Sequence, residues 1–295
     1  MHESIQGLGW FVRRTSDAGA LGRFYRAALG LPVLRAWDGP DGAGTMFYAG
    51  DVAVFEINRG GQVPVDPAQA ECTPVFRARD LDTALRQAVD AGAHVVDQHK
   101  STGAVYLTDV LGHVFGLRPP DDAAQHAPDA EAARRWSTDD RGLAGLAPLP
   151  AAIQDLGWVR LRVEDPAALA VFYRDMVGLD ILGETPEGGA LLHLGGTGCL
   201  ELAPGGARRP PPKDRIDITD VWILRIYDYV AMKAHLAVNR VPLVNELELA
   251  GGWLDYYLDP EGHLFGIQER KAPDPAVPNS NLAEDAAARR RWLVK

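Results

Sequence analysis

The strongest constraint on the fold is that the second half of the chain repeats the first. Residues 8–17 read LGWFVRRTSD and residues 156–165 read LGWVRLRVED, and a helical pattern follows each segment. Trp10 corresponds to Trp158 and Phe24 to Phe172, both 148 positions apart with no gap. Such self-similarity indicates a tandem duplication, so a structural inference for one half also applies to the other.

Length and composition predict two globular domains. The chain of 295 residues is too long for one typical core, and 46% hydrophobic with 24% charged residues is ordinary for a globular protein. We expect four segments: an N-terminal domain at 1–120, a linker with a short helix at 121–152, a C-terminal domain at 153–270 and a tail helix at 271–295.

The charge and the apolar pattern exclude several classes of partner. A formal charge of −10 disfavours nucleic acid and anionic lipid, and no apolar run is long enough to span a membrane. No signal peptide is visible at the amino terminus, and Cys72 and Cys199 lie at non-equivalent positions. We therefore expect a cytoplasmic protein, a monomer or a homodimer, whose partner is a small molecule.

Within each half the hydrophobic periodicity predicts two successive βαβββ units, which gives four units and an α+β fold. The predicted helices are 18–29, 81–89, 166–177 and 228–239, and Asp80 is expected to cap the second. His113 and His263 fall in the turns Gly112-His113 and Gly262-His263, out of phase with the inward-facing positions, and are interpreted as turn and packing residues.

These motifs together resemble one superfamily. Leu-Gly-Trp opens the first strand of each half, Phe-Tyr-Arg lies in each first helix, and Asp-Pro-Glu-Gly-His spans 259–263. The set resembles the vicinal oxygen chelate superfamily, which includes glyoxalase I, bleomycin-resistance proteins and extradiol dioxygenases, over residues 8–118 and 156–268. The resemblance implies two cup-shaped domains, each built from the paired units of one half, with a ligand on the inner face. One fold can host many reactions, so the motifs identify the fold rather than the reaction.

The resemblance also implies four metal-ligand positions in each domain, usually His on first strands and Glu on last strands. In the second half they fall on Trp158, Glu201, Val221 (or Trp222, one register on) and Gly266, and in the first half on Trp10, Glu56, Thr73 and Gly116. One carboxylate among four positions predicts neither a metal nor another cofactor. The alternative is a metal-dependent lyase or extradiol-type dioxygenase with atypical ligands.

Strand alternation predicts what the second cup offers instead. If Trp158 points inward, Arg160 and Arg162 do so too, and Arg225 has the same parity in the partner unit. These side chains would join Glu201 around one ligand. Arginine suits carboxylates and phosphates and stacks on aromatic rings, which predicts a small anionic or aromatic metabolite. The alternative is that Arg162 and Arg225 lie at the rim and pair with acidic residues.

Glu201 and His193 are the candidate catalytic residues. His193 lies on the strand before Glu201, and a histidine beside a carboxylate can act as a general acid or base. A hydrogen-bonded core histidine and a structural ion pair of Glu201 with an inward arginine are the alternatives.

The first cup repeats these positions as Trp10, Glu56 and Tyr48, which are its candidate ligand-binding residues. It is less polar, because Val12 stands where the second cup has Arg160. We therefore expect the main site in the C-terminal domain.

Three functions follow. The first is metal-independent binding of an anionic or aromatic metabolite, with or without lyase- or isomerase-type acid–base chemistry. The second is the atypical metal enzyme, and the third is a non-catalytic protein that sequesters an antibiotic.

Overall fold

The computed structural model describes residues 1–39, 42–50, 53–61, 67, 70–99, 102–119, 149–213, 218–249 and 252–269. The short helix predicted within 121–152 falls on residues outside these ranges, apart from 149–152, and so does the tail helix predicted at 271–295. Among the described residues, no helix has the length and apolar character needed to cross a membrane.

The chain forms four βαβββ units in sequence, which confirms the predicted α+β class. The first unit contains β1 (Ile5–Thr15), α1 (Ala18–Ala28), β2 (Val33–Gly39), β3 (Gly42–Tyr48) and β4 (Val54–Arg59). The second contains β5 (Cys72–Ala78), α2 (Leu81–Asp90), β6 (His94–Gln98), β7 (Val105–Thr108) and β8 (Val114–Arg118).

The third unit contains β9 (Ile153–Val163), α5 (Pro166–Phe172), the π-helical turn η2 (Tyr173–Val177), β10 (Asp180–Glu184), β11 (Ala190–Gly195) and β12 (Gly198–Pro204). The fourth contains β13 (Asp220–Ile226), α6 (Tyr229–Val238), β14 (Leu243–Leu249), β15 (Gly252–Leu258) and β16 (Leu264–Glu269).

One aspartate caps the helix of every unit, which explains why each helix begins where it does. The carboxylate accepts a hydrogen bond of 2.8–3.0 Å from the backbone N–H three residues on. Such a cap contributes about 1 kcal/mol to helix stability relative to alanine. The four capping residues are Asp17, Asp80, Asp165 and Asp228, so the prediction for Asp80 is confirmed.

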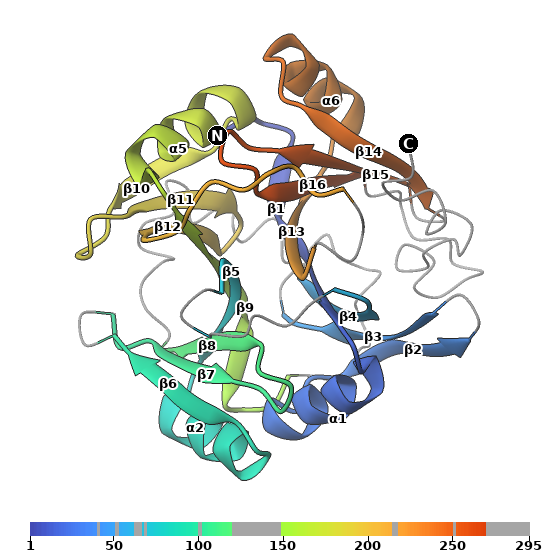
Figure 1. The fold of residues 1–295 in the computed structure, drawn as a ribbon, viewed down its shortest axis with the longest axis vertical. Coiled ribbons are helices and arrows are strands. Elements are labelled where there is room, and N and C mark those ends of the chain that lie inside the picture. Colours follow the sequence, from blue (N-terminus) through green and yellow to red (C-terminus); the bar gives the residue numbers. More distant parts are fainter. Residues whose placement is uncertain are drawn as a thin grey trace.

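Two eight-stranded sheets hold the four units, and each sheet combines both halves of the chain. Sheet A has the order β14-β15-β16-β13-β1-β4-β3-β2, and sheet B has the order β10-β11-β12-β9-β5-β8-β7-β6. The first unit therefore joins the fourth, and the second joins the third. In Figure 1 each sheet bends into a C shape, with β1 and β13 back to back with β5 and β9. The prediction that each half closes its own cup is wrong.

A buried ion pair explains this choice of strand partners. Arg13 lies opposite Asp220, and its Nε and Nη2 donate to the two carboxylate oxygens at 2.9 and 2.8 Å. At the equivalent place in sheet B, Leu161 lies opposite Cys72. In the same register, pairing within each half would put Arg13 opposite Cys72 and Asp220 opposite Leu161. Separating two buried charges in this way costs several kcal/mol, which favours pairing across the halves.

The glycine of the Leu-Gly-Trp motif lies at the same contact between strands of the two halves. A Cβ on Gly157 would lie 2.4 Å from the Arg77 Nε, and a Cβ on Gly9 would lie 2.7 Å from the Arg225 Cβ. The motif therefore lets an arginine of the partner strand lie close to the backbone. Arg77 Nε donates to Asp155 Oδ1 at 2.6 Å, which gives a second ion pair across the halves.

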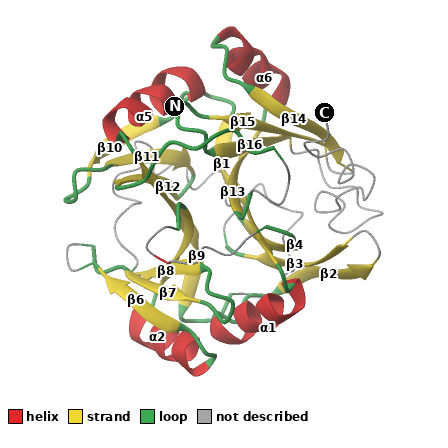
Figure 2. Cartoon of the chain, viewed as in Figure 1, coloured by secondary structure: helices red, strands yellow, loops and turns green. Residues whose placement is uncertain are grey.

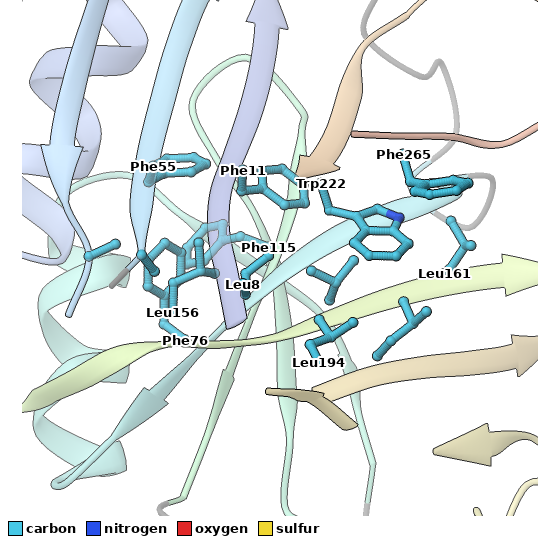
Figure 3. Close-up of a cluster of buried hydrophobic side chains, with 14 of the residues drawn as sticks. Leu8, Phe11, Phe55, Phe76, Phe115, Leu156, Leu161, Leu194, Trp222 and Phe265 are labelled. Carbon is cyan, nitrogen blue, oxygen red and sulfur yellow. The ribbon is translucent and has the colours of Figure 1, made fainter. Parts of the chain in front are cut away.

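The four helices lie on the outside of the sheets, with α1 and α2 at one end and α5 and α6 at the other (Figure 2). The faces of the sheets toward the helices share one hydrophobic core, in which residues from all four units meet. Figure 3 shows this contact, with Phe11, Phe55, Trp222 and Phe265 of sheet A packed near Phe76, Phe115, Leu156 and Leu161 of sheet B.

The opposite face of each sheet, which we call its inner face, carries a separate and smaller cluster without any helix residue. On sheet A it is extensively apolar. On sheet B it is smaller and contains Tyr106 and Trp158.

The turn histidines differ between the sheets, although both lie in the predicted turns. Burial, together with the nearby Arg13 guanidinium, lowers the pKa of His113 to about 2. Burial also lowers the pKa of His263, but the hydrogen bond and charge of Asp259, 3.0 Å from its Nδ1, outweigh this and raise it. Leu161 stands in the third unit where Arg13 stands in the first, so one substitution accounts for part of the contrast.

Replacing Asp220 by Cys should lower the free energy of unfolding by about 3 kcal/mol, because Arg13 would lose its partner while buried. The double variant Arg13→Leu, Asp220→Cys copies the Leu161–Cys72 pair and should be more stable than the single variant. Urea unfolding measures both. A double variant no more stable than the single one would show that Arg13 matters chiefly through its other partners. These are Tyr25 and the Val114 carbonyl, to which it donates at 2.7 Å each, and the buried Asp109 carboxylate, 3.6 Å from its Nη1.

Stability should fall in acid partly through His113. The pKa of His113 lies below its unfolded value of about 6.5, so its stabilisation is complete above that pH and is lost as the pH falls. The slope from this group is up to about 1.4 kcal/mol per pH unit. In urea unfolding between pH 6.5 and 4, His113→Phe should show a shallower decline than the unsubstituted protein. Equal slopes would contradict the assignment to His113.

Candidate functional site

The strand register divides the predicted site residues between the two inner faces. Sheet B holds four of them: Trp158, Arg160, Glu201 and His193. Sheet A holds another four: Trp10, Glu56, Tyr48 and Arg225. The predicted grouping of Arg225 with Trp158 in one cup is therefore wrong, because β13 pairs with β1 and not with β9.

Arg162 lies near the end of β9, where its Nη2 donates to the Gly205 carbonyl oxygen at 2.8 Å. It is half-buried, and its partner is backbone rather than the acidic side chain that the rim alternative named. A role for Arg162 in ligand binding stays a prediction.

Five side chains meet on the inner face of sheet B and form what we call the sheet B site. They are Tyr106 of β7, Arg118 of β8, Trp158 and Arg160 of β9, and Glu201 of β12. The first two come from the first half of the chain and the other three from the second half. Neither half contains the site alone.

The arginines of this site lie against its aromatic rings. The Arg118 Cζ is 3.5 Å from the centroid of the Trp158 ring. At that distance the guanidinium must lie face-on, because a steeply tilted group would push a nitrogen into the ring. The Arg160 Cζ is 5.0 Å from the Tyr106 ring centroid, and its Nε donates to Glu201 Oε1 at 3.2 Å. The site thus carries two guanidinium groups and one carboxylate.

Most of the sheet B site is buried, with Trp158 only 5% exposed, whereas the Arg160 side chain is 18% exposed. The two edges of sheet B approach each other beside it. His99, which follows β6, lies 5.1 Å from the Tyr106 ring, and its Nδ1 is 3.8 Å from Glu187 in the β10–β11 turn. Segments next to the two edge strands of sheet B, β6 and β10, therefore meet beside Tyr106.

Burial raises the pKa of the Tyr106 hydroxyl, and the charge of Glu201 raises it further. Tyr106 therefore keeps its proton at neutral pH and is a hydrogen-bond donor near a carboxylate. Sequence reasoning did not place Tyr106 or Arg118 in the main site, because it assigned the second unit to the other cup. The signal was present, since Arg118 follows Gly116 by two residues and so shares its face.

Sheet A has an equivalent tryptophan and glutamate, Trp10 and Glu56, but their hydrogen bonds differ from those in sheet B. Trp10 Nε1 donates to Glu56 Oε2 at 2.9 Å, and Asn58 donates to the other oxygen. Sheet A has Val12 in place of Arg160, so the indole and the amide satisfy Glu56. In sheet B Arg160 bonds Glu201 instead. Within the described part of the chain, the buried Trp158 Nε1–H has no hydrogen-bond acceptor.

The residues at the positions that the sequence resemblance assigns to metal ligands do not fit a metal ion. Sheet B brings together Trp158, Glu201, Thr73 and Gly116, and sheet A brings together Trp10, Glu56, Val221 and Gly266. Each set has one carboxylate, which another side chain already engages. In the ranges that the structure describes, no group of three or more His, Cys, Asp or Glu side chains is placed to hold a metal.

His193 lies beside the sheet B site but bonds elsewhere. Its Nε2 is 3.0 Å from the Gly196 carbonyl oxygen in the β11–β12 turn, which places a proton on Nε2. The geometry matches the hydrogen-bonded core histidine of the alternative interpretation. A catalytic role for His193 stays a prediction.

Comparisons with known proteins agree with this architecture. Residues 10–118 match the family described as glyoxalase-like domain. Glyoxalase I from Zea mays is similar in structure, with 15% identity, a TM-score of 0.62, and coverage of 89% of this chain and 92% of the other. A Bacillus subtilis protein provisionally described as a dioxygenase has 13% identity, a TM-score of 0.66, and coverage of 91% and 86%. No curated protein matches the sequence. At these identities the similar structures support the fold alone.

Proposed function

We propose that this chain, a tandem two-domain member of the vicinal oxygen chelate superfamily, binds a small anionic metabolite at the sheet B site without a metal. The observation that carries the proposal is the Arg118 guanidinium, 3.5 Å from the Trp158 ring, in a buried site with a second arginine. Arginine held flat on a ring keeps its edge N–H groups in a fixed fork, which suits a carboxylate or phosphate.

The charge of the site supports an anionic ligand. Arg118 and Arg160 face one carboxylate, Glu201, so these side chains carry one net positive charge in a buried place. Arg77 lies nearby on β5 but is paired with Asp155 and adds no net charge. Both guanidinium groups would attract an anion at this face, and burial would strengthen that attraction.

Acid–base chemistry at the same site is the second candidate function. Glu201 is a buried carboxylate, and Tyr106 is a protonated hydroxyl whose pKa the charge of Glu201 helps to raise. A proton acceptor and a proton donor on one inner face are the groups that a metal-independent lyase or isomerase needs. Sequestration without turnover uses the same binding site and lacks this step.

Replacing Arg118 by Gln, the residue that sheet A carries as Gln268, should weaken benzoate binding by about tenfold or more, because a charged hydrogen-bond partner is lost. Isothermal titration calorimetry measures the dissociation constant. The matched control is Arg35→Gln, since Arg35 also lies over an indole, 5.6 Å from Trp37, but is exposed in sheet A. Equal effects of the two substitutions would remove the sheet B site from the proposal.

Glu201→Gln should bind benzoate more tightly, up to about tenfold, because Arg160 would no longer face a carboxylate. The control Glu164→Gln removes one negative charge from an exposed residue just after the end of β9 and should leave the affinity within about twofold. Weaker binding by Glu201→Gln would contradict the assigned charge balance. Where a screen of carboxylates finds turnover, Glu201→Gln should abolish it, and retained turnover would exclude Glu201 from the chemistry.

A further inference from the structure

We infer that the indole N–H of Trp158 is a specificity-determining donor, which binds one oxygen of an oxyanion whose other oxygen is held by Arg118. The inference rests on the proposed function and deepens it by naming the atoms that select the ligand. The ligand class is a carboxylate or a similar group with two oxygens on one centre.

The two sheets use their equivalent indole N–H groups differently. In sheet A the indole N–H of Trp10 is used internally, because it donates to Glu56 at 2.9 Å. In sheet B Glu201 occupies the equivalent strand position but accepts from Arg160 at 3.2 Å. The Trp158 N–H makes no hydrogen bond to either oxygen of Glu201, so the donor that sheet A uses internally is left for a ligand in sheet B.

The indole N–H of Trp158 is a buried hydrogen-bond donor. Trp158 is buried, with only 5% of its surface exposed, and its Nε1 has no hydrogen-bond acceptor among the described residues. A buried donor without an acceptor costs about 1–3 kcal/mol, and a ligand oxygen would remove that cost. Among the described residues Trp222 also has a buried Nε1 without an acceptor, but its ring lies in the core, against the rings of Tyr173 and Phe265.

The stack of Arg118 on Trp158 brings two kinds of hydrogen-bond donor close together. The indole N–H points outward in the plane of the ring, and the Arg118 Cζ lies 3.5 Å from the ring centroid, with the guanidinium N–H groups at the edge of that group. The two oxygens of a carboxylate are about 2.2 Å apart, so a carboxylate at the edge of the stack spans the two layers with normal hydrogen bonds. A single-atom anion or a neutral hydroxyl satisfies one donor and leaves the other.

The test compares benzoate with benzyl alcohol, of similar size, by calorimetry on the full chain. Benzoate should bind, and benzyl alcohol should bind at least about a hundredfold more weakly. Trp158→Phe keeps a ring beneath Arg118 and removes the N–H, so it should weaken benzoate binding about tenfold. The control Trp222→Phe removes a buried indole N–H from the core and should leave benzoate affinity within about twofold.

A second measurement follows the Trp158 indole directly and does not depend on a change in benzoate affinity. In ¹H–¹⁵N spectra the indole signal of Trp158, assigned by its absence from Trp158→Phe, should move downfield on adding benzoate, while the other indole signals stay. An unmoved Trp158 signal, or Trp158→Phe binding benzoate as the unsubstituted protein does, would overturn this inference. The proposed function would still stand if Arg118→Gln weakens benzoate binding by about tenfold or more. No saturable benzoate binding by the unsubstituted protein would overturn both.

Discussion

The buried ion pair between Arg13 and Asp220 is the interaction on which the architecture depends. Four homologous strands lie at the centre of the molecule, and their apolar patterns alone would allow several pairings. The Arg13 guanidinium on β1 and the Asp220 carboxylate on β13 form their two-point contact in the core only when these strands are neighbours. That pairing commits β5 to β9, and with it the composition of both inner faces.

The functional consequence is that gene duplication produced two sheets of similar frame and different chemistry. Both frames contain a tryptophan and a glutamate on adjacent strands. In sheet A the two side chains bond each other and are surrounded by apolar residues. In sheet B Arg160 bonds the glutamate and Arg118 covers the indole. The tryptophan and glutamate therefore do not bond each other there, and the two arginines make this face polar and cationic.

Much of the fold could be predicted from the sequence, because it is encoded locally. The repeat gives the four units, aspartates mark the helix starts, and alternation identifies Trp158 and Arg160 as inward neighbours. Strand partners could not be predicted this way, since β5 and β13 have the same periodicity and only the register of Arg13 with Asp220 distinguishes them. For that reason Arg225 was grouped with the wrong sheet, and Arg118 was missed.

A crystal structure of the protein with bound benzoate tests the central claim most directly, because it reports strand pairing and ligand position together. We expect benzoate on the inner face of sheet B, contacting Arg118 from the first half of the chain and Trp158 from the second. Benzoate held by residues of one half alone, or β9 paired with β13, would contradict it.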